Sequence, residues 1–310
     1  QGIIQGGTGS GSDFKESTYD ALLTVTGSDC GTKIVETRMG TLACADDVVF
    51  MAPSEFELQQ QIQLFNYFTN KDRFKIHPQT SYVSIFNPTQ SEFEYYQSAQ
   101  PWKINGAPAT VSHEFTHLGI QYNLEKPSLT ISNTIDARLK TGRNTTYGLM
   151  GAGLHGVNGV NPSVSNHMYQ IYVMPRITYS LEFLSISSAN MRRLETAHNS
   201  ILRDVQSLPT RTAIPALHIL LGTLPMQATI EQKQIALIPS LLNNDTILDI
   251  IIHQLATKSQ KSHSWVIKTQ ELLHKYELPC IIDIAASDIS KEKWKERVKT
   301  AVCLFWKRSI

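Results

Sequence analysis

The stretch Thr41-Leu42-Ala43-Cys44-Ala45-Asp46-Asp47-Val48-Val49-Phe50-Met51 places two adjacent aspartates between two apolar runs. The alternating and β-branched residues on both sides predict two strands joined by a tight Asp-Asp turn, which would bring both carboxylates to a sheet edge. Mg²⁺ prefers oxygen ligands and is often held by one or two carboxylates together with substrate phosphates. Asp46 and Asp47 are therefore candidate catalytic, metal-binding residues. Ordinary turn chemistry is the competing explanation, because aspartate side chains also hydrogen-bond to local backbone groups.

A glycine-rich segment comes before this hairpin. It reads Gln1-Gly2-Ile3-Ile4-Gln5-Gly6-Gly7-Thr8-Gly9-Ser10-Gly11-Ser12-Asp13-Phe14, and a helix is predicted to follow over residues 15–26. The glycine spacing fits neither the G-x-G-x-x-G pattern nor a P-loop, which argues against a nucleotide loop of either kind. Taken alone, the segment is typical of a flexible loop or chain terminus.

The order of these elements resembles the palm of reverse transcriptases, in particular those of non-LTR retrotransposons. In that family the pattern Gln-Gly-x-x-x-Ser-Pro-x-x-Phe precedes a helix beneath the template and incoming nucleotide, and an aromatic-Ala-Asp-Asp turn follows. Gln5, Gly6, Ser10 and Phe14 stand at matching spacing. Three further segments resemble, in order, the palm helix, the hairpin beneath the primer, and the thumb helix with its exit segment: residues 58–68, 117–120 and 169–182.

The resemblance implies an RNA-directed DNA polymerase that works by two-metal nucleotidyl transfer. Asp46 and Asp47 would hold Mg²⁺ or Mn²⁺, and the partners would be an RNA template, a DNA primer and deoxynucleoside triphosphates. The resemblance assigns nucleotide and template contacts to Gln5, Gly6, Ser10, Phe14, Cys44 and Ala45. It assigns primer contacts to Leu118 and Gly119.

The family's chemistry also needs an aspartate on a strand before the Gln-Gly segment. The chain opens inside that motif, so we expect a fragment or a decayed copy that is inactive by itself. Asp13 and Asp20 fall too late in the order of elements to replace the missing carboxylate. We expect them to carry helix-start and surface charge instead.

Other positions have diverged from the family pattern. Cys44 occupies the aromatic position before Ala-Asp-Asp, and we expect it to be buried as a small hydrophobe. His77 and Thr80 stand where the family has Asn-x-x-Lys, and threonine has neither the charge nor the reach of lysine. A non-catalytic nucleic-acid-binding or domesticated remnant is therefore the alternative to a polymerase fragment. A product with no selected activity is a third possibility.

Composition sets further limits. With 310 residues and 41% hydrophobic content, the chain can bury a sizeable core and should form more than one structural unit. A net charge of +1 gives the chain no overall positive potential, so any binding of nucleic acid must come from local clusters of basic residues. Three such clusters are Lys71, Arg73 and Lys75; Arg138, Lys140 and Arg143; and the basic residues of 291–308. Each is more typical of a solvated helix face than of a phosphate site.

The four cysteines are widely separated, which disfavours both a zinc site and a disulfide framework. We find neither an apolar run of membrane-span length nor a signal peptide. The expected setting is thus intracellular, in the nucleus or the cytoplasm, with no membrane partner.

The predicted fold class is α+β: a partial polymerase palm (an antiparallel sheet with helices) over residues 1–125, an all-helical thumb over 126–187 and a helical C-terminal region over 188–310. In the first region we expect strands at 80–86, 109–111 and 117–120, a polar stretch between Ser91 and Trp102, and a hairpin turn at Asn105-Gly106.

From residue 133 the periodicity is helical, with an expected break at Gly142. A long apolar helix interrupted at Pro175 is predicted for residues 164–184, and helices are expected at 213–220, 230–242 and 247–255. Between them, one buried helix face is predicted from Met191, Leu194, His198, Ile201, Leu202 and Val205. Trp265, Trp294 and Trp306 stand among basic residues and could grip a strand, although core packing is the more typical role.

Overall fold

The computed structural model describes residues 10–72, 76–154 and 159–309, and shows an α+β chain that is 61% helical and 11% strand. This confirms the predicted fold class at the coarse level. The chain divides into two compact units, residues 1–127 and 128–310. The palm, thumb and C-terminal ranges expected from the sequence stay predictions.

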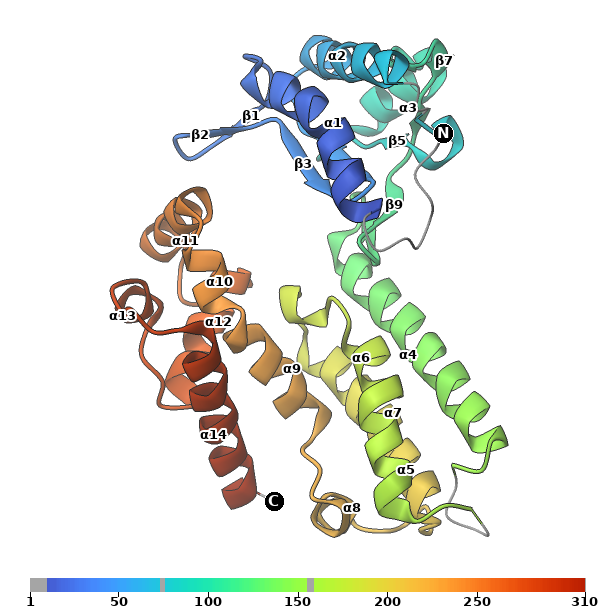
Figure 1. Cartoon of the computed structure of the whole chain (residues 1–310), viewed down its shortest axis with the longest axis vertical. Coiled ribbons are helices and arrows are strands. Elements are labelled where there is room, and N and C mark those ends of the chain that lie inside the picture. Colours follow the sequence, from blue (N-terminus) through green and yellow to red (C-terminus); the bar gives the residue numbers. More distant parts are fainter. Residues whose placement is uncertain (1–9, 73–75, 155–158, 310) are drawn as a thin grey trace. The chain divides into compact units, whose positions relative to one another are not determined.

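Unit 1 combines three helices with short strands (Figure 1). Its elements are α1 (Ser10–Gly27), β1 (Thr32–Ile34), β2 (Thr37–Met39), β3 (Thr41–Cys44), β4 (Asp47–Phe50), α2 (Glu55–Lys71), the 3₁₀ turn η1 (Pro78–Thr80), β5 (Tyr82–Val83), α3 (Gln90–Ala99), β6 (Lys103–Ile104), β7 (Ala107–Pro108), β8 (Thr110–Val111), β9 (Glu114–His117) and β10 (Ile120–Asn123).

The described strands of unit 1 form five separate two-stranded pairs. Four pairs are antiparallel hairpins of neighbouring strands, whereas β5 and β8 pair in parallel. The expected antiparallel sheet is thus present only as hairpins. Each strand has two to four residues, and hairpin turns with positive φ interrupt the chain at Val35, Ala45, Asn105 and Leu118.

Three strand predictions in unit 1 need correction. The strand expected over 80–86 is limited to Tyr82–Val83, because η1 precedes it and Asn87 takes a positive φ of 50° before Pro88. The strand expected over 109–111 forms as Thr110–Val111. The strand expected over 117–120 is instead the turn between β9 and β10, with register His117 to Ile120.

The polar stretch between Ser91 and Trp102 contains a helix that the sequence analysis missed. Thr89 caps α3 through a capping box, in which its hydroxyl accepts from the Glu92 amide and the Glu92 carboxylate accepts from the Thr89 amide. By contrast, the Asn105-Gly106 turn is confirmed between β6 and β7, with φ of 50° and 81° at its two residues.

Two apolar clusters form the core of unit 1. In one, α1 packs against α2, and Val48 and Phe50 of β4 pack on Ala21, Val25 and Phe65. The other gathers around Trp102, Val83 and Val111. The first cluster places the Asp46–Asp47 hairpin directly beside the two helices.

Unit 2 is helical throughout its described part (Figure 1). Its elements are α4 (Pro127–Gly151), α5 (Pro162–Met168), the π-helical turn η2 (Tyr169–Val173), α6 (Met174–Thr178), the 3₁₀ turn η3 (Leu181–Phe183), α7 (Ser188–Gln206), α8 (Ile214–Leu221), α9 (Met226–Ala236), α10 (Ile238–Leu242), α11 (Asp245–Thr257), α12 (Trp265–Lys275), α13 (Ile281–Ala285) and α14 (Lys291–Ser309).

Gly142 does not break α4, contrary to the prediction. A Cβ at this position would lie 2.4 Å from Ile177 Cγ1, so the glycine permits close packing of α6 on an uninterrupted helix. The helix expected over 164–184 is divided earlier than Pro175, at the π-helical turn η2. Pro175 has no amide proton to donate to the carbonyl four residues before it, which explains the irregular turn at this point.

The helix expected over 230–242 is two helices, α9 and α10. Pro239 cannot donate to the carbonyl of Ile235, and the indole Nε1 of Trp294 donates to that oxygen at 3.0 Å. Trp294 is 1% exposed, and Trp265 and Trp306 are partly buried against the same cluster. Core packing is therefore confirmed for these three side chains.

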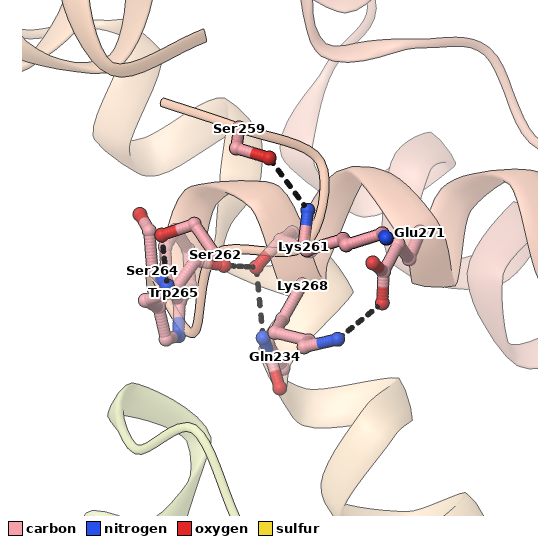
Figure 2. Close-up of polar contacts among 9 residues, drawn as sticks. Gln234, Ser259, Lys261, Ser262, Ser264, Trp265, Lys268 and Glu271 are labelled. Carbon is pink, nitrogen blue, oxygen red and sulfur yellow. Dashed lines mark hydrogen bonds and ion pairs between the residues drawn. The ribbon is translucent and has the colours of Figure 1, made fainter. Parts of the chain in front are cut away.

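Polar contacts fix the start of α12 (Figure 2). The hydroxyls of Ser259 and Ser262 accept from the amides of Lys261 and Ser264. Within the interior, Gln234 Nε2 of α9 donates to Thr269 Oγ1 of α12 at 2.8 Å. The Gln234–Thr269 bond satisfies buried polar groups between two packed helices.

The predicted buried face of α7 is confirmed: Leu194, His198, Ile201, Leu202 and Val205 are buried, and Met191 packs against them. His198 is 0% exposed. Its Nε2 lies 3.2 Å from the carbonyl oxygen of Leu224, and its Nδ1 lies 2.7 Å from the hydroxyl of Tyr169. Because a carbonyl only accepts, Nε2 carries the proton and Nδ1 accepts from Tyr169.

Candidate functional site

The Asp46–Asp47 hairpin forms as predicted, with a shift of one residue in its turn. Cys44 pairs with Asp47, so Ala45 and Asp46 are the two turn residues and Asp47 begins β4. Ala45 takes a positive φ of 54°, as the first central residue of a type II′ turn does. All four residues from Cys44 to Asp47 are exposed, and both carboxylates lie at the end of the hairpin.

Cys44 is exposed, which contradicts the expected buried position. The packing of the hairpin on α1 and α2 comes from Val48 and Phe50, on β4 nearer its base, and the strand end at Cys44 lies outside this cluster. Cys30, by contrast, is buried, and all four cysteines are free.

A buried glutamine of α2 holds the base of the hairpin. Gln61 is 0% exposed, and its Nε2 donates to the carbonyl oxygens of Gly40 at 3.2 Å and Met51 at 3.3 Å. The amide of Met51 donates to Gly40 O at 2.8 Å. Together these bonds tie both strands of the hairpin to α2, while Phe50 contacts Phe65 edge-on at a centroid distance of 5.3 Å.

Two glycines make this arrangement possible. A Cβ on Gly40 would lie 2.8 Å from Cys30 O and 2.9 Å from Gln61 Nε2. A Cβ on Gly31 would lie 2.8 Å from Gly40 Cα. Gln61 was not among the residues predicted from the sequence, although it is a polar residue within the apolar face formed by Leu58, Ile62 and Phe65.

The residues assigned to template and nucleotide are only partly described. Gln5 and Gly6 lie outside the described residues. Ser10 begins α1 and Phe14 lies one turn later, and the helix expected over 15–26 is confirmed with longer bounds. Asp20 of the same helix is exposed, as expected for surface charge.

Leu118 and Gly119 form the tip of the β9–β10 hairpin, with φ of 47° and 75°. The hairpin expected at this point is thus confirmed, and Leu118 is 39% exposed. Phe115 and Tyr122 stack across the two strands at 5.0 Å. The Tyr122 ring is half-buried and lies opposite Phe115, so it belongs to the support of the hairpin rather than to its tip, and this burial raises the pKa of its hydroxyl.

The side-chain donors at the tip of the β3–β4 hairpin are of a type that suits a hard cation. Asp46 and Asp47 offer carboxylate oxygens, the ligands that Mg²⁺ and Mn²⁺ prefer, and Cys44 contributes no oxygen. Within the described part of the chain, no three His, Cys, Asp or Glu side chains are grouped to hold a metal ion. The two carboxylates alone would be an incomplete coordination sphere, and a cation bound there would take its remaining ligands from water or substrate phosphate.

The three basic clusters differ in environment. Lys71 is exposed at the end of α2, and Arg73 and Lys75 lie outside the described residues. Arg138 stacks over the ring of Tyr179 at 4.6 Å, and partial burial lowers the pKa of its guanidinium, whereas Lys140 and Arg143 are exposed. The basic residues at 291–308 lie on α14.

No protein-family model matches the chain, and no curated protein matches it significantly. Among the described residues, no single helix has the length and apolar composition to cross a membrane; α9 to α11 meet both criteria only as a pair of segments bent by 119°.

Proposed function

We propose that the chain is a part of an RNA-directed DNA polymerase of a non-LTR retroelement. The observation that carries the proposal is the exposed Asp46–Asp47 pair at the end of a hairpin that Gln61 ties to a packed helix. A metal-binding pair must be exposed to substrate and held on a rigid support, and this hairpin has both properties.

In this proposal Asp46 and Asp47 hold Mg²⁺ or Mn²⁺. The ion, when bound, would neutralise negative charge on the triphosphate and favour deprotonation of the primer hydroxyl. Ala45 and Cys44 lie beside the reacting groups because they share the hairpin tip with the two aspartates. Gln5, Gly6, Ser10 and Phe14 shape the pocket for template and incoming nucleotide, and Leu118 and Gly119 contact the primer.

The proposed partners are an RNA template, a DNA primer and deoxynucleoside triphosphates, in an intracellular setting. The additional aspartate of the family pattern is expected on a strand before Gln5. By itself, the 310-residue chain is proposed to bind template and primer without extending the primer.

A specific observation favours a second candidate, a non-catalytic nucleic-acid-binding remnant. Thr80 stands at the position of the family's lysine, and its hydroxyl donates to the carbonyl of His77 at 3.3 Å. The side chain is thus engaged locally and supplies no positive charge for a triphosphate.

Primer extension separates the two candidates. The protein is produced with the coding sequence that naturally precedes residue 1, and extension of a DNA primer on an RNA template is measured with Mg²⁺ or Mn²⁺. The polymerase proposal predicts metal-dependent extension that Asp46→Asn or Asp47→Asn reduces by at least a hundredfold, because the ligand charge is lost.

The matched control is Asp20→Asn, an exposed aspartate of α1, which should leave extension unchanged. If the protein binds template and primer normally but does not extend in any metal, the polymerase proposal is wrong. Binding of the hybrid that decreases with salt and survives Asp46→Asn would then support the remnant.

A further inference from the structure

Helix α14 concentrates positive charge. Of the 28 lysines and arginines in the chain, seven lie in this helix, compared with two of the 27 acidic residues. Because the net charge of the whole chain is +1, the rest of the chain is net acidic. All seven cations are exposed, and none forms an ion pair within the described residues: Lys291, Lys293, Lys295, Arg297, Lys299, Lys307 and Arg308.

A groove of about 740 Å³ runs beside α14. Its other wall is formed by residues 275–278, at the end of α12 and directly after it. Lys293, Arg297, Leu304 and Arg308 all line the groove. At 3.6 residues per turn these four positions fall within about 60° of arc, so they form one stripe along the helix. The adjoining face of α14, centred about 110° around the helix axis from the stripe, carries Trp294, Val298 and Val302, which are buried in the core.

The inner wall of the groove is a closed aromatic and ionic cluster. Lys275 pairs with Glu231 at 2.7 Å and lies over the rings of Tyr276, Phe305 and Trp306 at 4.9–5.1 Å. Its charge is therefore used within the protein. The charges available to a ligand are those of the stripe on α14.

We propose that this groove binds a single-stranded polynucleotide. The stripe from Lys293 to Arg308 extends over about 22 Å at 1.5 Å per residue, so its cations face a row of charges rather than one compact anion. A polynucleotide backbone presents such a row of phosphates. Leu304, 51% exposed, and Leu278 give apolar surface between the cations for sugars and bases.

Two carboxylates, Glu277 and Glu296, also line the groove. They reduce the attraction for phosphate but leave the cations in the majority. The choice of a polynucleotide over another polyanion rests on the proposed function. The charge and shape of the groove are independent of that proposal.

The test compares two pairs of substitutions on the same helix. Lys293→Gln with Arg297→Gln removes two cations from the groove, and Lys295→Gln with Lys299→Gln removes two cations, at the same spacing, from outside it. All four side chains are exposed, and circular dichroism verifies that both variants fold. Binding of the full chain to fluorescein-labelled (rU)20 and (dT)20 is measured as a function of salt.

The groove pair of substitutions should make the plot of log K against log salt less steep by about 1.4, since each phosphate contact on a single strand contributes about 0.7. This change in slope corresponds to a loss of about 25-fold in affinity at 0.1 M salt. The outer pair should retain most of the wild-type affinity. The two oligonucleotides distinguish an RNA strand from a DNA strand, and either result fits the proposal.

Three results would overturn the inference: equal losses in both pairs, no binding at 20 mM salt, or binding to phosphatidylserine vesicles without binding to either oligonucleotide. Oligonucleotide binding by the two pairs of α14 variants and primer extension are separate measurements. Failure of the groove is therefore separable from failure of the polymerase proposal, which primer extension tests.

Discussion

The buried histidine His198 should make the stability of unit 2 depend on pH. Burial, with a smaller contribution from the neighbouring His218, lowers the pKa of His198 from 6.5 to about 3. Below pH 6.5 the unfolded chain therefore takes up a proton that the folded state does not bind. Stability is fully present above pH 6.5 and is lost as the pH falls towards 3, by about 1.4 kcal/mol per pH unit.

Between pH 7 and pH 5 this linkage amounts to about 2 kcal/mol. Burial also lowers the pKa of His218, which acts in the same direction. Burial raises the pKa of Glu195, so this carboxyl opposes the histidines by stabilising the folded state at low pH. A variant of His198 isolates its own contribution from the other two.

His198→Gln keeps an amide donor and an acceptor but removes the titration. The assay is urea unfolding at pH 7, 6 and 5, followed by tryptophan fluorescence. Both proteins carry Trp102→Phe, because Trp102 is the only one of the four tryptophans in unit 1. The stability difference between wild type and variant should shrink by about 2 kcal/mol from pH 7 to pH 5. A difference that stays constant across this range would show that His198 does not titrate differently in the folded and unfolded states.

Three further predictions follow from the packing within each unit. Gln61→Leu removes the two hydrogen bonds to Gly40 and Met51, and should destabilise the β3–β4 hairpin by about 1–3 kcal/mol. The amide of Met51 should then exchange its hydrogen faster, and unchanged protection would show that Gln61 does not hold the hairpin. Gly142→Ala should destabilise unit 2, because the new Cβ would lie 2.4 Å from Ile177 Cγ1. Gly148→Ala in the same helix meets nothing within 4 Å and should stabilise the unit by about 0.5–1 kcal/mol. In urea unfolding, the two variants should therefore change the free energy of unfolding in opposite directions, and changes in the same direction would contradict the packing of Ile177 on Gly142. Exposed Cys44 should react with a thiol reagent in the folded protein well before buried Cys30, and Cys44→Ser should remove the fast phase of the reaction.

Local chemistry explains the parts of the fold that the sequence predicts well. Asn105-Gly106 forms the predicted turn, because asparagine and glycine tolerate the positive φ that a tight hairpin needs. The buried face of α7 follows from the 3.6-residue spacing of its apolar residues.

Long-range packing explains the parts that the sequence does not predict. Gly142 looks like a helix break until Ile177 is placed against it, and Pro239 interrupts a helix whose free carbonyl is satisfied by Trp294, 59 residues away. At the candidate site, the aspartate hairpin was predictable from its turn residues. The local pattern of α2 marks Gln61 as an unusual polar residue on an apolar face, but its hydrogen-bond partners and the exposure of Cys44 depend on how α1 and α2 pack on β4.

The central claim, that Asp46 and Asp47 form a metal-binding pair, is tested most directly by titrating the isotope-labelled chain with Mn²⁺ and recording paramagnetic broadening of its amide signals. Signals of the hairpin tip, from Cys44 to Val48, should broaden first, and Asp46→Asn with Asp47→Asn should abolish this broadening. Excess Mg²⁺ should reverse it, because both ions prefer carboxylate oxygens. Broadening that begins elsewhere, or that persists at the hairpin in the double variant, would contradict the claim.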